Sequence, residues 1–408
     1  MILSISWKNV WRNKTRSMVV ILAVALGLFG TIFMIAMMNG MINQKVDSSI
    51  SNESSNIQIH NPKFLEDKSI QYVINDGDKI LQEVENIEGV RAVCRRIKTT
   101  AMISTANSGN GIMINGINPE QEKKVTNIYQ LLVDGSYFEK TYRSTPTMLI
   151  SQNLSKKLKA NVGSKIVLTI QSTSGEITYG LYRVVGIYKT ANSVFDEMNV
   201  FVNNESLVSL IGVKPDQTSE IAIRLDNNNS TDVMTLKLKE KFSKLSVLSW
   251  KELDPTVVAM VTLLDQFNYF MVAIIMIALT FVIINAMLMA ILERTRELGM
   301  LMAIGMNKRK VFLMVMMETI FMSITGAILG IILSLVTVTI TQKQGINFAA
   351  VAEGMESLGY SALIHPTVQT AFYVIIGIIV IITASIASIW PARKALKLQP
   401  AEAVRSEA

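Results

Sequence analysis

The chain of 408 residues has one cysteine, Cys94, and two histidines, His60 and His365. A single cysteine excludes an intramolecular disulfide, and so few thiol and imidazole groups argue against a structural zinc site and against a catalytic nucleophile–base pair. No G-x-x-x-x-G-K-[ST] phosphate loop occurs, which excludes ATP hydrolysis by that route. We therefore expect no catalytic residue, no metal site and no cofactor bound by the chain itself, and we interpret Cys94 as a buried, inert residue.

Charge is also scarce, because only 17% of the residues are charged while 50% are hydrophobic and the mean hydropathy is +0.35. The net charge of +7 does not indicate a nucleic-acid-binding protein, since many basic residues flank apolar runs instead of forming a basic domain. A helix needs about 20 apolar residues to cross a hydrocarbon core of about 30 Å. Four runs qualify, and only the third contains a charge, Glu318: Met18 to Met38, Phe267 to Leu292, Val311 to Ile340 and Val368 to Trp390.

The first run is too long for the apolar core of a cleaved signal peptide, and no small-residue cleavage site follows it. We interpret it as an uncleaved signal anchor. Lysine and arginine then set the orientation, because they concentrate in cytoplasmic flanks. They cluster before the first run, between the second and third, and after the fourth, whereas the segment between the third and fourth runs holds only Lys343. We expect both termini to be cytoplasmic in a bacterial inner (plasma) membrane protein.

The predicted fold is a membrane α-helical protein with four transmembrane helices and a large mixed α/β extracytoplasmic domain between the first and second. Strand-like runs of the outer segment include Asn56 to His60, Lys165 to Ile170 and Tyr182 to Tyr188. The predicted parts are a cytoplasmic amphipathic helix (1–17), transmembrane 1 (18–40), the extracytoplasmic domain with a helical stalk (41–266), transmembrane 2 (267–292), a cytoplasmic coupling helix (293–310), transmembrane 3 (311–340), a short outer loop (341–367), transmembrane 4 (368–390) and a cytoplasmic tail (391–408).

The predicted stalk follows from the two junctions of the outer segment. Asp254 followed by Pro255 is typical of a helix N-cap and first helical position, and no breaker follows before Leu292. After the first run, apolar residues continue at helical spacing from Met38 to Ile50. Both membrane helices are therefore predicted to continue beyond the bilayer.

The N-terminal segment predicts an interfacial helix. Trp7 and Trp11 lie four residues apart, with Arg12 and Arg16 on the adjoining face. Indole rings and basic side chains together are typical of the headgroup region of a bilayer. We expect these four residues to lie at the membrane interface.

The segment from Glu293 to Val311, ERTRELGMLMAIGMNKRKV, predicts a short amphipathic helix. A narrow apolar stripe at i, i+3, i+4 and i+7 is formed by Leu298, Leu301, Met302 and Gly305, whereas Glu293 and Glu297 share another face. A hairpin between two membrane helices needs no apolar stripe, so we predict that this helix docks into the groove of a cytoplasmic partner.

This segment resembles the signature of the FtsX/MacB-like permease family, E-R-T-R-E-[IL]-G-x-x-x-A-[IL]-G. The start, WKNVWRNKTRSM, resembles the family's amphipathic N-terminal helix, and WPARKALKLQPAEAVR, from Trp390 to Arg405, resembles its C-terminal tail. The resemblance implies a MacB-like periplasmic core domain and a permease that pairs with a second copy or paralogue and with a cytoplasmic ABC ATPase dimer, which binds the ATP and Mg²⁺. It also implies mechanotransmission in place of a substrate pore. The implied ATPase-coupling residues are Glu293, Arg294, Arg296, Glu297, Gly299, Ala303 and Gly305.

The outer segment indicates a branch of this family. The stretch from Tyr182 to Val202 resembles the lipoprotein-releasing (LolC/LolE-type) branch, which implies release of lipoproteins to a periplasmic carrier. One alternative is an efflux permease for drugs or peptides that works with a periplasmic adaptor. An alternative of another class is a signal transmitter that moves no substrate and controls a cell-wall hydrolase.

Two features inside the membrane runs remain. Glu318 is predicted to be a structural anchor of the coupling helix, paired with a nearby basic residue such as Arg309 or Lys310. Flexible thioether side chains at the outer end of the first run form an adaptable apolar surface that could contact lipid or the acyl chains of a lipoprotein. These possible substrate-contact residues are Met34, Met37, Met38 and Met41.

Overall fold

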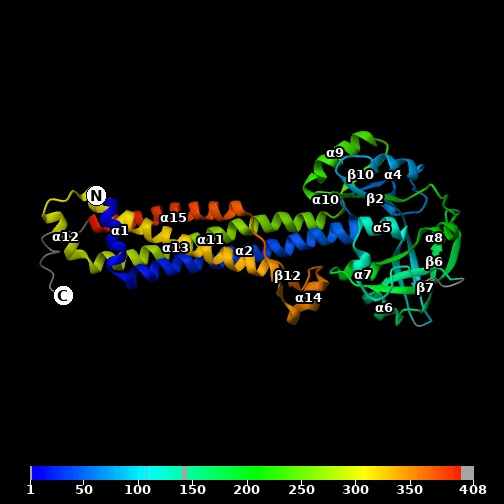
Figure 1. Ribbon diagram of the computed structural model, residues 1–408, viewed down its shortest axis with the longest axis horizontal. Coiled ribbons are helices and arrows are strands. Elements are labelled where there is room, and N and C mark those ends of the chain that lie inside the picture. Colours follow the sequence, from blue (N-terminus) through cyan, green and yellow to red (C-terminus); the bar gives the residue numbers. More distant parts are fainter. Residues whose placement is uncertain (1, 107, 140–144, 397–408) are drawn as a thin grey trace. The chain divides into compact units, whose positions relative to one another are not determined.

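The computed structural model describes residues 2–106, 108–139 and 145–396 (Figure 1). The chain divides into two compact units. A helical unit comprises Met1–Ile42, Met260–Asn347 and Leu363–Ala408, and an α/β unit comprises Asn43–Ala259 and Phe348–Ala362.

Four helices are long and apolar enough to cross a membrane. They are α2 (Lys14–Ser48), α11 (Pro255–Glu293), α13 (Lys308–Gln344) and α15 (Thr370–Leu396). Two short helices accompany them, α1 (Ile2–Arg12) and α12 (Thr295–Ala303). The four long helices run side by side (Figure 1). The four predicted apolar runs therefore all lie in helices that can span a bilayer.

Two glycines bring α13 directly against the backbone of α2. A Cβ atom on Gly326 would lie 2.8 Å from the carbonyl oxygen of Ile21, and one on Gly330 would lie 2.7 Å from that of Ala25. Small residues four apart on one face let helices approach closely where no hydrophobic effect drives them together. Close van der Waals packing thus joins the first and third long helices.

The prediction that two long helices continue beyond the apolar runs is confirmed. The side chain of Asp254 accepts a hydrogen bond from the backbone amide of Val257 at 3.2 Å, and α11 begins at Pro255. Helix α2 passes Gly40 and ends at Ser48, where the π-helix η1 (Ser49–Ser54) follows.

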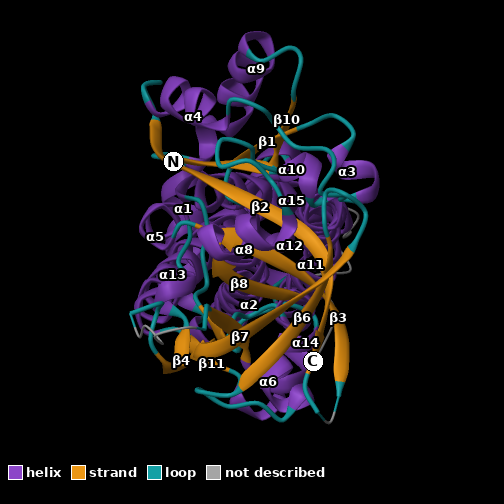
Figure 2. Ribbon diagram, turned by 90° about the vertical axis from the view of Figure 1, so that its right-hand side faces the viewer, coloured by secondary structure: helices purple, strands orange, loops and turns teal. Residues whose placement is uncertain are grey.

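Ten strands of the α/β unit form one sheet, and six of them close on themselves. The pairings run β2 to β3, β8, β5, β7 and β6 and return to β2, so these strands have no free edge in the ring (Figure 2). The strands are β1 (Ile57–His60), β2 (Val90–Ser104), β3 (Gly109–Ile117), β4 (Leu132–Gly135), β5 (Thr147–Ser151), β6 (Lys165–Gln171), β7 (Ile177–Tyr188), β8 (Asn199–Asn203), β9 (Glu220–Leu225) and β10 (Ser246–Ser249).

Helices and short turns complete the α/β unit. They are α3 (Phe64–Asp67), α4 (Gly77–Glu85), α5 (Pro119–Val125), η2 (Ile128–Gln130), α6 (Gln152–Leu158), α7 (Ser193–Met198), α8 (Asn204–Ile211), η3 (Asn228–Ser230), α9 (Thr231–Lys241) and α10 (Trp250–Leu253). One apolar core includes Ile114, Leu168 and Val200 from the ring strands, and a second one includes Ile59 and Leu81. The expected strand runs at Asn56 to His60, Lys165 to Ile170 and Tyr182 to Tyr188 fall on β1, β6 and β7.

The segment between α13 and α15, expected to be a short loop, has structure of its own. It contains β11 (Ile346–Asn347), η4 (Ala349–Val351), α14 (Ala352–Ser357) and β12 (Leu363–Ile364), and β11 pairs with β12. Within the α/β unit, α14 packs beside α7, and the Lys189 ammonium lies 3.0 Å from a Glu356 carboxylate oxygen. Part of this segment therefore belongs to the α/β unit.

A buried ionic cluster lies in the α/β unit between β2, β9 and α5. Arg96 is 2% exposed and donates hydrogen bonds to both carboxylate oxygens of Glu122, at 2.7 and 2.9 Å, and to Glu220 at 2.7 Å. The Lys98 ammonium approaches the other Glu220 oxygen to 2.7 Å, and His60 lies 3.7 Å from it. Burial alone would raise the pKa of the Glu220 carboxyl, but Lys98 and Arg96 outweigh it and lower the pKa to about 2. We call this set the Arg96 cluster.

Cys94 is also buried beside this cluster, and its thiol donates a hydrogen bond to Glu122 at 3.2 Å. Burial raises the pKa of the Cys94 thiol well above its ordinary value. A thiol held in its protonated form is a poor nucleophile, so the structure agrees with an unreactive cysteine.

Candidate functional site

The N-terminal helix α1 lies against α13 through polar and aromatic contacts. The Ser6 hydroxyl donates a hydrogen bond to the carbonyl oxygen of Met314 at 3.2 Å. The Trp7 ring meets Phe321 edge-on, with 5.5 Å between ring centroids, and Trp11 meets Trp7 at 5.9 Å. Both indoles keep more than two-fifths of their surface exposed. This arrangement suits rings that sit at a membrane interface.

Glu318 lies on α13 and is the buried acceptor of the site. It is 3% exposed, and Asn9 of α1 donates a hydrogen bond to it at 2.7 Å. One guanidinium nitrogen of Arg294 lies 3.2 Å from each of its carboxylate oxygens. A carboxylate in an apolar bundle requires such compensation, because an unpaired buried charge is strongly unfavourable.

The predicted pairing of Glu318 with Arg309 or Lys310 is wrong. Both basic residues lie in the first turns of α13 and are exposed. Arg294 lies between the end of α11 at Glu293 and the start of α12 at Thr295, and its side chain reaches Glu318 from there. The anchoring interaction therefore ties the start of α12 to α13.

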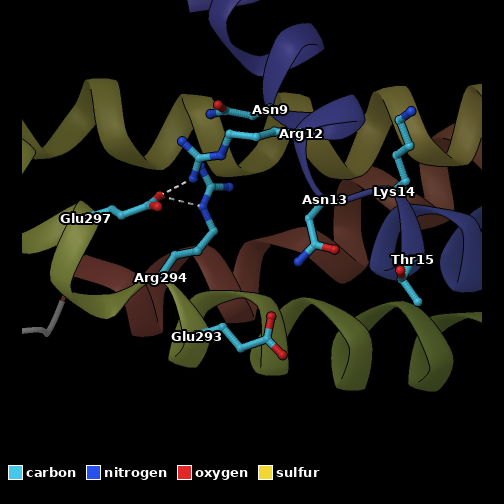
Figure 3. Close-up of a pocket in the computed structure, with 8 residues that line it drawn as sticks. All are labelled: Asn9, Arg12, Asn13, Lys14, Thr15, Glu293, Arg294 and Glu297. Carbon is cyan, nitrogen blue, oxygen red and sulfur yellow. Dashed lines mark hydrogen bonds and ion pairs between the residues drawn. The ribbon is translucent and has the colours of Figure 1, made fainter. Parts of the chain in front are cut away.

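A second carboxylate, Glu297, joins α12 to α1. The Nε atom of Arg294 donates a hydrogen bond to Glu297 at 3.0 Å, and the Arg12 guanidinium binds the same oxygen (Figure 3). Partial burial by itself raises the pKa of the Glu297 carboxyl, but the hydrogen bonds from Arg12 and Arg294 outweigh it and leave this pKa below its ordinary value. We call Arg12, Arg294, Glu297, Glu318 and Asn9 the Glu318 cluster.

A polar cavity of about 580 Å³ adjoins this cluster. Figure 3 shows the Arg12 and Arg294 side chains pointing toward Glu297, whereas Glu293 lies apart from that bridge. The cavity is lined by Asn9, Arg12, Asn13, Lys14, Thr15, Glu293, Arg294 and Glu297. The lining offers charged and amide groups for docking polar side chains, and these residues show no nucleophile paired with a base.

Helix α12 turns its predicted apolar stripe inward. Leu298 is 3% exposed, and Leu301 and Met302 pack against the core of the helical unit. Gly299 is also buried. The side chain of Leu298 is therefore unavailable for docking into a partner, while Leu301 and Met302 are partly covered and Gly305 is exposed. The three apolar side chains of the predicted stripe pack α12 onto its own bundle, which differs from the expectation from their spacing.

The outward face of α12 is formed by other residues. Met300 and Ile304, the residue directly after α12, are 49% and 79% exposed, and Arg296 and Ala303 are exposed beside them. Sequence reasoning missed Met300 and Ile304, although their spacing of four residues is itself a helical pattern.

A glycine ends helix α12. Gly305 has a φ of +100°, and the amides of Gly305 and Met306 donate to the carbonyls of Met302 and Leu301. Such a helix end favours glycine, because a Cβ atom is strained at that φ. Gly305 thus shapes the turn that separates α12 from α13.

The remaining predicted residues form no joint site with these. Met34 on α2 is 42% exposed, while Met37, Met38 and Met41 are half-buried along the same helix. The side chain of Arg16 and the tail motif from residue 397 onward lie outside the described residues.

Comparison with known families identifies the chain. Residues 17–240, more than half of it, match the profile of the MacB-like periplasmic core domain. The chain belongs to this family. Residues 269–400 match the FtsX-like permease C-terminal profile, so the two together make it an ABC transporter permease of the FtsX/MacB type.

Individual relatives of this permease cover it to different extents. The lipoprotein-releasing system transmembrane protein LolC of Neisseria meningitidis is 22% identical over 360 residues, which are 83% of this chain and 84% of LolC. The macrolide export ATP-binding/permease protein MacB of Chlorobaculum tepidum is 36% identical over 126 residues, which are 31% of this chain and 17% of MacB. The crystal structure of the periplasmic region of MacB from Actinobacillus actinomycetemcomitans is 11% identical, covers 52% of this chain and 97% of that one, and superposes with a TM-score of 0.35.

Proposed function

We propose that this permease is the membrane subunit of an ABC system that releases lipoproteins from the inner membrane, using ATP hydrolysed by a separate subunit. The observation that carries the proposal is the likeness to LolC along most of both chains, in a sequence without a phosphate loop. In this proposal ATP and Mg²⁺ bind the ATPase partner, and this chain contributes no catalytic group.

The orientation belongs to the proposal as well. Both termini and α12 face the cytoplasm, and the α/β unit, most of which lies in the sequence between α2 and α11, is extracytoplasmic. The basic residues around Arg12 and Lys310 support this orientation, because lysine and arginine favour the cytoplasmic side. A second permease copy or a paralogue completes the membrane part, and a periplasmic lipoprotein carrier receives the cargo.

The Glu318 cluster gives the proposed coupling a physical basis. The exposed face of α12, with Arg296, Met300 and Ile304, contacts the ATPase. Arg294 links α12 to α13, and Glu297 links it to α1. A displacement of α12 would therefore move α1 and α13 with it, and α13 in turn packs closely against α2. On the outer side, Met34 and its neighbouring methionines offer an adaptable surface for acyl chains.

The proposal is tested by depleting the protein and separating inner from outer membranes while tracking lipid-modified proteins. We expect mature lipoproteins to accumulate in the inner membrane. Complementation with wild-type protein should reverse the accumulation, whereas a variant with Ile304→Asp on the exposed face of α12 should not. Normal lipoprotein sorting in the depleted cells would remove the releasing role.

One observation favours a second candidate, an efflux permease that works with a periplasmic adaptor. The local identity to MacB, 36%, exceeds the identity to LolC, although it covers only 31% of this chain. Depleted cells that sort lipoproteins normally but accumulate a drug or peptide would support this candidate.

A further inference from the structure

An open groove of about 630 Å³ lies on the surface of the helical unit, beside the C-terminal half of α11, which faces the cytoplasm in the proposed orientation. Its lining is apolar except for one carboxamide and the indole N–H. The lining residues are Phe281, Val282, Ile284, Asn285 and Leu288 of α11 and Trp390 of α15. Phe281 and Trp390 are 69% and 55% exposed, so two large aromatic side chains present their surfaces at this groove.

Asn285 has an unusual position for a polar residue. It lies eight residues before the end of α11 at Glu293, which is roughly 12 Å of helix at 1.5 Å per residue. Its side chain is exposed, and its carboxamide has no hydrogen-bond partner in the part of the chain that the structure describes. A side chain as short as that of asparagine cannot reach the interface from this depth.

Two hydroxyl side chains near the groove on the same two helices are satisfied within their own helix. The Thr280 hydroxyl donates to the carbonyl of Met276 at 2.8 Å, and the Ser385 hydroxyl donates to that of Ile381 at 2.8 Å. The Asn285 carboxamide lacks such a bond and faces the space where the hydrocarbon of the bilayer would lie. An unsatisfied amide in hydrocarbon costs roughly several kcal/mol.

The chemistry of the amide indicates what covers it. Lipid acyl chains could fill the groove but offer no donor or acceptor. An asparagine side chain carries both, so two copies that meet by a two-fold axis can satisfy each other reciprocally. Asparagine bonds between membrane helices are an established source of helix association, and aromatic anchors beside them are typical of the centre of an interface.

We propose that two copies of this permease contact each other in the membrane at this groove, with each Asn285 hydrogen-bonded to Asn285 of the other copy. The proposal rests on the proposed function, in which the permease works as a pair, and it specifies the face through which the pair forms. Phe281 and Trp390 of one copy then pack against α11 of the other.

The test introduces a cysteine at the groove. Cys94 is fully buried, so Asn285→Cys supplies the reactive thiol in an otherwise unaltered full-length chain. Membranes that contain this variant and the ATPase subunit are treated with an oxidant. The matched control is Leu313→Cys on α13, which is 43% exposed and lies five residues from the end of its helix at Lys308. We expect a disulfide-linked dimer for Asn285→Cys and none for Leu313→Cys.

Two further variants separate the hydrogen bond from the shape of the groove. Asn285→Leu should weaken self-association in detergent by about tenfold, the size expected for an interhelical polar bond. Asn285→Gln, which retains donor and acceptor, should restore most of it.

The outcomes distinguish this proposal from the function beneath it. Three results would overturn this interface without affecting the proposed permease function. The first is a chain that is dimeric by native mass but forms no disulfide at position 285. The others are equal cross-linking at positions 285 and 313, and unchanged self-association of Asn285→Leu. A disulfide to a different polypeptide would also overturn it. If the chain is monomeric in the presence of its ATPase subunit, the proposal that the permease works as a pair is also wrong.

Discussion

The two units each contain an arginine between two glutamates, and the two clusters differ in burial and in what they join. In the α/β unit, Arg96 and its partners Glu122 and Glu220 are at most 2% exposed. In the helical unit, the side chain of Arg294 is 14% exposed, with Glu318 at 4% and Glu297 at 48%. The Arg96 cluster holds β2, β9 and α5 within one unit. The Glu318 cluster joins the short helices α1 and α12 to the long helix α13.

This difference teaches which ion pairs can move. Breaking a fully buried pair leaves a charge without solvent or partner, so such a cluster fixes one geometry. An exposed member such as Glu297 can exchange its partner for water at little cost. The Glu318 cluster therefore combines a fixed half, Glu318 with Arg294, and a labile half, Glu297 with Arg12, which suits the coupling role proposed for it.

The largest expected effect comes from breaking the Arg96 cluster. Arg96→Met should leave Glu122 and Glu220 buried without their common partner and lower the free energy of unfolding of the α/β unit by about 3–5 kcal/mol. Hydrogen exchange of β2 and β9 in the purified full chain measures this loss. Lys98→Met, whose partner Glu220 keeps Arg96, is the matched control and should cost less. A loss below about 1 kcal/mol for Arg96→Met would contradict the assignment.

The next effect is expected in the helical unit. Arg294→Gln removes the countercharge of Glu318 and should reduce stimulation of the ATPase subunit several-fold, while the protein still inserts into the membrane. The double variant Arg294→Leu, Glu318→Leu should regain stability, because both charges are gone, but not the stimulation. ATPase assays of reconstituted complexes together with thermal unfolding test both parts. Full stimulation by Arg294→Gln would show that the pair plays no part in coupling.

The contrast between the clusters also shows what the sequence could and could not predict. The apolar runs are long and uninterrupted, so the four long helices followed directly from hydropathy. The Arg96 cluster escaped sequence reasoning, because its members are distant in the chain. Arg96 meets Glu220 through the pairing of β2 with β9, and it meets Glu122 through the packing of α5 against these strands. The partner of Glu318 was mispredicted for the same reason. Arg309 and Lys310, which are close to Glu318 in the sequence, were favoured over Arg294, which lies farther away between α11 and α12.

The orientation of α12 gives a second example. Its apolar stripe was identified correctly as a pattern, but a pattern does not reveal whether the stripe faces a partner or the chain's own bundle. Leu298 faces the bundle, and the outward surface is formed by Met300 and Ile304. The family resemblance, in contrast, was confirmed by both profiles.

A moderate effect is expected from pH on the Arg96 cluster. Burial lowers the pKa of the His60 imidazole from its ordinary value of 6.5. Below about pH 6.5 the unfolded chain therefore binds more protons at His60 than the folded chain does. The contribution of His60 to the free energy of unfolding is fully present above about pH 6.5 and is lost as the pH falls below it. Glu220, with a pKa of about 2, loses its contribution only at much lower pH. Burial raises the carboxyl pKa of Glu53 to about 7 and that of Asp196 to about 6, and these two groups act in the opposite direction over the same range. The expected result is therefore a relative one: between pH 7.5 and 5 the unfolding temperature of the wild type should fall relative to that of His60→Gln. An equal change in both proteins would assign the pH dependence to other groups.

The smallest effect is expected at the exposed bridge. Arg12→Gln removes one of the two partners of Glu297 and should cost at most about 1 kcal/mol, with Arg294 still in place. The loss should shrink further at 1 M salt, where charges more than about 3 Å apart are screened. Thermal unfolding at low and high salt measures both. A large loss of stability that does not change with salt would show that the Arg12–Glu297 bridge is as fixed as the buried ion pairs.

The π-helix η1 (Ser49–Ser54) has a consequence for how the chain tolerates changes in length. A π-helical turn contains one residue more than the α-helical turn it replaces. Deletion of one residue within this segment would convert the wide turn into an ordinary one, so that α2 before it and the strand β1 after it can keep their places. The same deletion a few turns earlier in α2 would rotate every later side chain by about 100°. In this part of the protein, a single-residue deletion should therefore be absorbed in η1 and disruptive in α2.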